Sequence, residues 1–127
     1  MWSATRIALL SLLLCLPAQA QAQAQEVKIG STLACDTQQQ VQRFVSLYHG
    51  DAADAAKTVN SEVKNPTACD MVAVAYVSGP EIATVRTQSR TYRIVRILVL
   101  GIVTTAGIAP AQPSMFYSFV PMDERGA

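Results

Sequence analysis

The sequence of 127 residues is poor in the residue types that most often carry chemistry, with one histidine, three cysteines and one tryptophan. It contains no phosphate-binding loop, no dinucleotide-binding glycine motif, no nucleophile elbow and no zinc-protease motif. Its longest nearly apolar run, residues 7–16, is far shorter than the roughly 20 residues that a helix needs to span a bilayer. These absences argue against the motif-bearing enzyme classes and against a membrane-spanning helix.

The N-terminal segment 1–24 has the layout of a secretory signal peptide. Arg6 supplies a positive charge ahead of the apolar run 7–16, Pro17 ends the run, and alternating alanine and glutamine follow. Cleavage is expected after one of three alanines: Ala20, Ala22 or Ala24. The segment therefore predicts a periplasmic or secreted protein.

Cleavage changes both the charge and the cysteine count of the remaining chain, 25–127, which is predicted to form one small domain. Loss of Arg6 reduces ten basic residues to nine, which balance the nine acidic residues. A neutral domain is not expected to bind nucleic acid or a membrane surface. Loss of Cys15 leaves Cys35 and Cys69, and two cysteines in an exported domain most often form a disulfide. A redox pair or a zinc site would need closer spacing or more ligands, so no metal and no cofactor are indicated.

Helical periodicity predicts two helices in the first half of the domain. The first, 37–49, follows a cap at Asp36 or Thr37 and ends at Gly50. The second begins at Asp51 directly afterwards and ends before an Asn-Pro pair. Because the connection is short, we expect an antiparallel helix pair.

Strand patterns flank the predicted helices on both sides. A short strand, 27–34, precedes them, with a possible bulge at its glycine. Four strands are expected after them: 71–77, 81–87, 92–104 and 115–120. A turn at 78–80 and a loop at 107–113 separate some of these strands. The prediction is an α+β domain of two layers, in which a mostly antiparallel four-stranded meander packs on the helix pair and one disulfide joins the two.

His49, the lone histidine, is the one candidate for general acid–base catalysis. With Asp51 or Asp54 to orient it, His49 suggests a small hydrolase or a metal-dependent enzyme. The plainer interpretation is a histidine at a helix end, followed by two carboxylates that cap the next helix. The sequence supplies no nucleophile, which favours the plainer interpretation.

Four arginines form the one cluster of like charge, and no acidic residue lies between Glu81 and Asp123. They are Arg86, Arg90, Arg93 and Arg96. A hairpin folded symmetrically about residues 89–90 would place Arg86 opposite Arg93, and such a like-charged pair destabilises a sheet unless an anion or an acidic partner is bound. The alternatives are a solvated strand face or a different register.

Three segments together resemble small exported proteins of Gram-negative bacteria: CDTQQQ at 35–40, NPTAC at 65–69 and YRIVRI at 92–97. This resemblance implies export but carries no activity and no site residue. A helix pair followed by an antiparallel sheet is also similar in outline to inhibitor and assembly-factor modules of bacterial envelopes, although the strand before the helices departs from that outline.

The leading hypothesis from the sequence is a non-catalytic binding module that uses its sheet surface or an edge strand. Its partner would be a protein or a small anionic ligand. One alternative is the enzyme around His49. The other is an envelope structural protein that forms homo-oligomers through the apolar strand 94–103.

Overall fold

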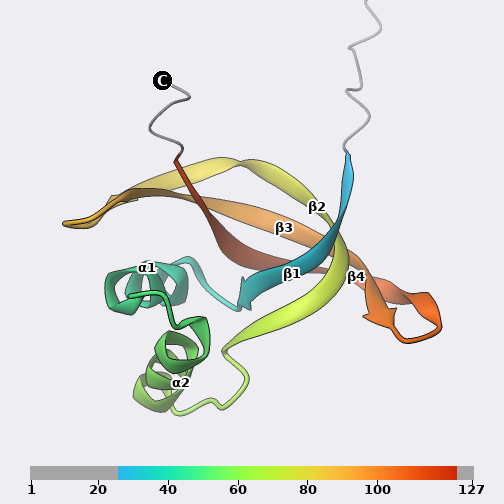
Figure 1. Cartoon of the computed structure of the whole chain (residues 1–127), viewed down its shortest axis with the longest axis horizontal. Coiled ribbons are helices and arrows are strands. Elements are labelled where there is room, and N and C mark those ends of the chain that lie inside the picture. The colour runs from blue at the N-terminus through green and yellow to red at the C-terminus, as the bar shows by residue number, and fades with distance from the viewer. Residues whose placement is uncertain (1–25, 123–127) are drawn as a thin grey trace, which may run out of the picture.

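The computed structural model of the chain describes residues 26–122. Two helices are inserted between the first two of four strands (Figure 1). In chain order the elements are β1 (Val27–Cys35), α1 (Gln38–Leu47), α2 (Ala52–Val63), β2 (Cys69–Arg86), β3 (Thr91–Thr104) and β4 (Gly107–Pro121). The predicted signal peptide, 1–24, and the C-terminal residues 123–127, for which a frayed end is predicted, lie outside the described residues.

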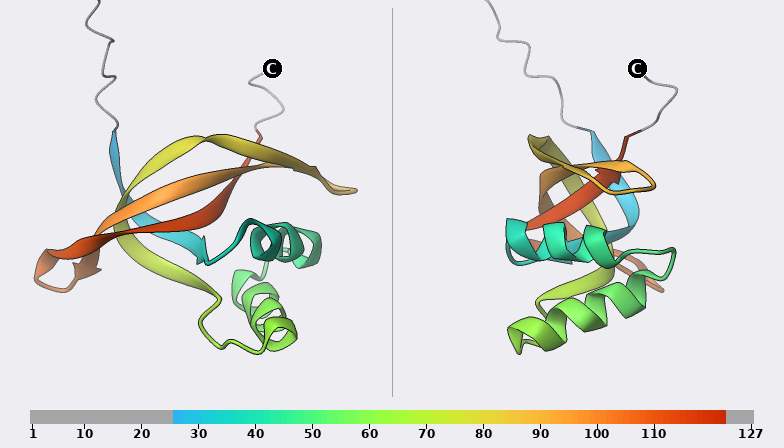
Figure 2. Two further views of the ribbon diagram at one scale, coloured as in Figure 1. Left: turned by 180° about the vertical axis from the view of Figure 1, so that it is seen from behind. Right: turned by 90° about the vertical axis from the view of Figure 1, so that its left-hand side faces the viewer.

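The four strands form one closed antiparallel sheet in the order β1–β2–β3–β4. Closure rests on a single pair, Cys35 of β1 opposite Tyr117 of β4. The antiparallel helix pair packs against the outside of the sheet at one end (Figure 2). The predicted α+β class, with a first strand, a helix pair, antiparallel strands and a disulfide, is therefore confirmed.

The prediction of two separate strands at 71–77 and 81–87 is wrong, because both belong to the single strand β2. The expected turn at 78–80 is a bulged stretch in which the register against β3 shifts on both sides of Glu81. A side chain at Gly79 would lie 3.0 Å from the carbonyl oxygen of Arg96, so glycine permits the close approach of the two strands. Pro80, which has no N–H to donate, falls in the irregular stretch where a ladder bond is not required.

The predicted loop at 107–113 is also strand, since β4 begins at Gly107, directly after a tight turn from β3. Pro110 and Pro113 are tolerated because this part of β4 pairs only with β3 and leaves its other edge free among the described residues. The bulge predicted at Gly30 is absent, and β1 pairs with β2 in an unbroken register.

Caps fix the ends of both helices. Thr37 caps α1, and its reciprocal partner in the capping box is Gln40. The sequence alone did not distinguish Asp36 from Thr37 as the capping residue. Asp51 caps α2, as predicted, by accepting from the backbone N–H of Asp54. The left-handed Lys64 ends α2.

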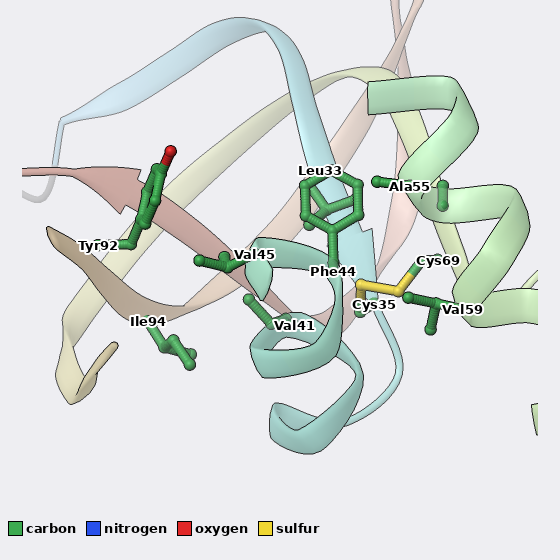
Figure 3. Close-up of a cluster of buried hydrophobic side chains, with 11 residues drawn as sticks. Leu33, Cys35, Val41, Phe44, Val45, Ala55, Val59, Cys69, Tyr92 and Ile94 are labelled. Carbon is green, nitrogen blue, oxygen red and sulfur yellow. A yellow bond between two sulfur atoms is a disulfide. The ribbon is translucent and has the colours of Figure 1, made fainter. Parts of the chain in front are cut away.

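One hydrophobic cluster joins the helices to the sheet (Figure 3). Phe44 of α1 is fully buried and packs against Phe119 of β4 in a tilted arrangement, with ring centroids 5.4 Å apart. The disulfide between Cys35 and Cys69 lies in the same cluster, with the two residues directly opposite each other on β1 and β2. It closes the base of the helix insertion, as predicted.

A second cluster fills the inside of the closed sheet. Its buried members are Ala34, Val74, Val95, Ile97 and Val99. Because residues alternate between faces along a strand, Ala34 points into this cluster while its neighbours Leu33 and Cys35 point to the helices. We call these two sides the inner face and the helix-covered face.

Candidate functional site

The inner face of the sheet opens into a cleft of about 650 Å³ near the disulfide. The cleft exists because β1 ends at Cys35, where the chain turns into α1, whereas β4 begins ten residues before the closing contact at Tyr117. Beyond that contact the N-terminal half of β4 has no strand partner on its free side among the described residues. The cleft lies between this half of β4, the end of β3 and the start of β2.

The floor of the cleft is apolar and its rim is polar. Apolar side chains of all four strands line it: Ala34, Val72, Ala73, Val74, Val99, Ile102, Val103, Ala111 and Phe116. Polar residues border it: Asp36, Thr67, Asp70, Gln112 and Ser114. A cleft of this size with an apolar floor and a few polar groups is typical of a ligand-binding site.

Among residues 26–122, two carboxylates, those of Asp36 and Asp70, are the only charged groups that line the cleft. Asp70 lies opposite Ala34 on the inner face, and the backbone N–H of Asp36 donates to the carbonyl of Ala68 at 2.9 Å. Neither carboxylate forms a hydrogen bond or an ion pair within residues 26–122. Asp70 also borders a second hollow beside α2 that includes Lys57, which is not paired with it in that same part of the chain. The cleft therefore presents negative charge beside an apolar floor.

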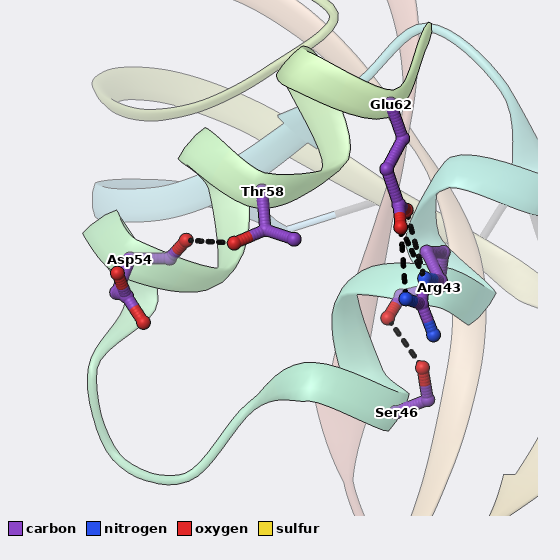
Figure 4. Close-up of polar contacts among 5 residues, drawn as sticks. All are labelled: Arg43, Ser46, Asp54, Thr58 and Glu62. Carbon is purple, nitrogen blue, oxygen red and sulfur yellow. Dashed lines mark hydrogen bonds and ion pairs between the residues drawn. The ribbon is translucent and has the colours of Figure 1, made fainter.

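The histidine and two aspartates of the enzyme hypothesis are not joined by hydrogen bonds within residues 26–122. His49 is exposed in the connection between the helices, and no carboxylate within residues 26–122 is hydrogen-bonded to it. The Asp51 carboxylate caps α2, and the Asp54 carbonyl accepts from Thr58 at 3.1 Å (Figure 4). The Asp51 contact matches the plainer interpretation of a capped second helix, whereas His49 lies one residue past the C-cap of α1 at Tyr48.

His49 nevertheless lines a small polar hollow of about 390 Å³. The other lining residues come from the same connection and from the β2–β3 hairpin: Tyr48, Gly50, Ser89, Arg90 and Tyr92. The fold thus places His49 and Arg90, which the sequence assigned to separate hypotheses, at the same hollow.

The four arginines of the cluster are not gathered in one place. In the observed register Arg86 lies opposite Thr91 and Arg93 lies opposite Thr84, so the direct Arg86–Arg93 pair expected from a symmetric hairpin does not form. The reason is that the hairpin turns at 87–90, where Thr87 bonds the backbone of Arg90. Arg96 points to the other side of β3 from Arg93, where its guanidinium lies 6.0 Å from the Tyr117 ring centroid.

Sequence reasoning missed the cleft and its two rim carboxylates. A signal for them exists, because the dipeptide Cys-Asp occurs twice, at 35–36 and 69–70. Because β1 and β2 are antiparallel, the aspartates that follow the two cysteines lie on either side of the disulfide along the strands, and both line the cleft. The apolar strand of the self-association hypothesis, 94–103, lies within β3. Ile94 and Ile97 are buried, whereas Arg96, Ile102 and Val103 are exposed.

Among residues 26–122 no group of three potential metal ligands comes together. No helix in this part of the chain has the length and apolar character needed to cross a membrane. Comparison with models of protein families, with curated proteins and with solved structures finds no match to the chain. A proposal for the function must therefore rest on the geometry of the cleft and the hollow.

Proposed function

We propose that the protein is an exported, non-catalytic binding module whose cleft takes an extended peptide segment with apolar and basic side chains. The observation that carries this proposal is the cleft of about 650 Å³, with an apolar floor and a rim to which residues 26–122 contribute two carboxylates and no cation. Apolar side chains of the segment would be buried on the floor, and basic side chains would meet Asp36 and Asp70.

An extended segment fits the site because the cleft runs beside the free edge of β4. Unpaired backbone groups at a sheet edge bind added strands. Pro110 and Pro113 have no N–H to donate, which leaves fewer backbone donors in this half of β4, so the segment would be held mainly by its side chains in the cleft. The same two prolines disfavour edge-to-edge pairing with a second copy.

Export is supported by the predicted signal peptide, 1–24, and is compatible with the disulfide. A disulfide persists in the oxidising periplasm or outside the cell and is rare in the cytoplasm. The partner is therefore expected to be a segment of another exported protein.

The test uses fluorescence anisotropy with a dye-labelled peptide of alternating valine and lysine. Ile102 lines the cleft and is 51% exposed, so Ile102→Glu should leave the fold intact and weaken binding by about tenfold or more, since it places a carboxylate on the apolar floor. The matched control is Ile29→Glu, because Ile29 is 60% exposed, also on a strand, and points to the opposite face of the sheet. Equal binding by both variants would refute the cleft as the site.

A second arm tests the charge of the rim. The double variant Asp36→Asn and Asp70→Asn should reduce affinity for the lysine peptide about two- to thirtyfold, because two exposed ion pairs each contribute about 0.2–1 kcal/mol. Asp54→Asn is the control, since Asp54 lies on α2 and does not line the cleft. A peptide with glutamate in place of lysine should bind more weakly than the lysine peptide. Preference for the glutamate peptide would refute the assigned partner.

A further inference from the structure

The start of β1, residues 27–29, carries the side chains that the cleft is proposed to bind. Val27 is 51% exposed and Ile29 is 60% exposed, and the exposed Lys28 lies between them. In Figure 1 this start of β1 lies on the side of the sheet away from both helices. Because β1 pairs with β4 only at Cys35, the edge of 27–29 that faces away from β2 is free among residues 26–122. We call residues 27–29 the donor segment.

A second stretch with apolar and basic residues, 92–97, is not accessible to a partner in the same way. It belongs to β3, which pairs with β2 on one side and β4 on the other. Its side chains Tyr92, Ile94 and Ile97 are all buried. The apolar side chains of the donor segment, in contrast, are about half exposed.

The donor segment cannot enter the cleft of its own copy. Side chains alternate between the two faces along β1, so Val27 and Ile29 share a face with Leu33, whereas the cleft lies on the inner face with Ala34. The rim is also distant, since Asp36 follows the end of β1, roughly 26 Å from the donor segment at about 3.3 Å per residue. A contact between the donor segment and the cleft therefore requires two copies.

We propose that the cleft binds the donor segment of a second copy of this chain. This assignment rests on the proposed function, because it names the partner of the same cleft. Val27 and Ile29 of one copy lie on the apolar floor of the next copy, and Lys28 reaches the carboxylates of Asp36 and Asp70 at the rim. The charges are complementary, and none of these three charged groups forms an ion pair within residues 26–122.

Apolar contact supplies most of the affinity. The preceding Glu26 has the same charge as the rim and offsets part of the attraction of Lys28. Exposed ion pairs contribute little in any case, whereas Val27 and Ile29 lose their exposed apolar surface on binding. Because the donor segment is short, the association is weak and needs a high protein concentration.

The contact joins two different surfaces of the molecule, so it is head-to-tail. Each added copy leaves one donor segment and one cleft unoccupied, and such contacts produce chains or closed rings. Sedimentation velocity of the protein recovered after export, with its disulfide formed, should therefore show species larger than a monomer as the concentration rises from micromolar to millimolar.

Two variants and their mixture test the head-to-tail arrangement. Ile29→Glu disables the donor segment and Ile102→Glu disables the cleft, so each alone should weaken self-association about tenfold or more, because a carboxylate replaces an apolar contact. An equal mixture of the two should restore a dimer and nothing larger, since the intact cleft of one variant binds the intact donor segment of the other. The restored dimer also shows that both variants fold.

A charge variant tests the contact with the rim. Lys28→Gln should weaken self-association about 1.5- to fivefold, the range expected for one exposed ion pair. The matched control is Arg86→Gln, because Arg86 is also an exposed cation on a strand and does not line the cleft. An equal loss in both variants would indicate a diffuse field and overturn the assigned contact.

Two further results would overturn the inference. One is a monomer at millimolar concentration although the valine–lysine peptide binds the cleft, which would leave the proposed function standing. If this peptide also binds Ile102→Glu and Ile29→Glu equally, the proposed function fails as well. The other is self-association that survives in Ile29→Glu, or a mixture of the two variants that stays monomeric, because either would exclude head-to-tail binding of the donor segment.

Discussion

Removal of the disulfide is the perturbation whose cost can be worked out most directly. Cys35 and Cys69 lie directly opposite each other on β1 and β2, and their side chains are 0% and 1% exposed. The bond spans a sequence separation of 34, so it closes a loop that contains both helices. On the chain-entropy model a loop of this length lowers the entropy of the unfolded chain enough to stabilise the fold by about 3.8 kcal/mol. That is a large fraction of the roughly 5–15 kcal/mol by which a domain is stable.

The assay is equilibrium urea unfolding of the oxidised chain, the reduced chain and the double variant Cys35→Ala, Cys69→Ala. Both perturbed forms should lose about 3–4 kcal/mol in the free energy of unfolding. The alanine variant should lose slightly more, because it also leaves small voids in the buried cluster. Both should show a steeper dependence on urea, since their unfolded chains are less compact and expose more surface. A loss below about 1 kcal/mol on reduction would refute the reasoning, because the loop closure would then carry little of the stability.

Three further predictions concern the rest of the chain. The Asn60 amide accepts from the N–H of Cys69 at 2.7 Å and donates to its carbonyl at 2.9 Å, so Asn60→Ala should cost about 2–4 kcal/mol in urea unfolding by leaving buried backbone groups unpaired. The hydrogen bond to Arg43 lowers the pKa of Glu62 below its ordinary 4.5, so this exposed pair stabilises the fold at neutral pH and the contribution is lost as the pH falls through the lowered pKa. Glu62→Gln should therefore cause only a small loss of thermal stability at neutral pH, which disappears in high salt. Mass spectrometry of the protein recovered after export should show a chain that lacks its first 20, 22 or 24 residues.

The helices could be predicted closely because local signals set their position. The apolar spacing of Val41, Phe44 and Val45 puts three buried side chains on one face, and the caps at Thr37 and Asp51 are local contacts. Strand ends were harder to predict, because glycine and proline have two meanings in a sheet. At 78–80 and 107–113 they mark a bulge and a free edge, and which meaning applies depends on the neighbouring strand.

The candidate sites could not be predicted from the sequence for a related reason. The cleft forms because β1 ends at Cys35, whereas β4 extends well beyond Tyr117, the residue that pairs with Cys35. This difference depends on how two strands far apart in the chain pair with each other. The hollow depends on the β2–β3 hairpin reaching the helix connection, so that Arg90 and His49 line the same hollow. Composition identified both residues as unusual, but only the fold brings them together.

The helix insertion connects the cleft and the hollow, because each lies at one of its ends. At its base, the disulfide holds the chain segments that carry Asp36 and Asp70, and Asn60 bonds the backbone of Cys69. At its far end, Tyr48 packs on Phe44 and leads directly into His49. Residues of the insertion therefore reach the cleft rim at one end and the hollow at the other, although the sheet supplies most of the walls of the cleft. A change that tilts the helix pair on the sheet would alter both the cleft and the hollow, whereas a change confined to the β3–β4 hairpin would alter the cleft alone.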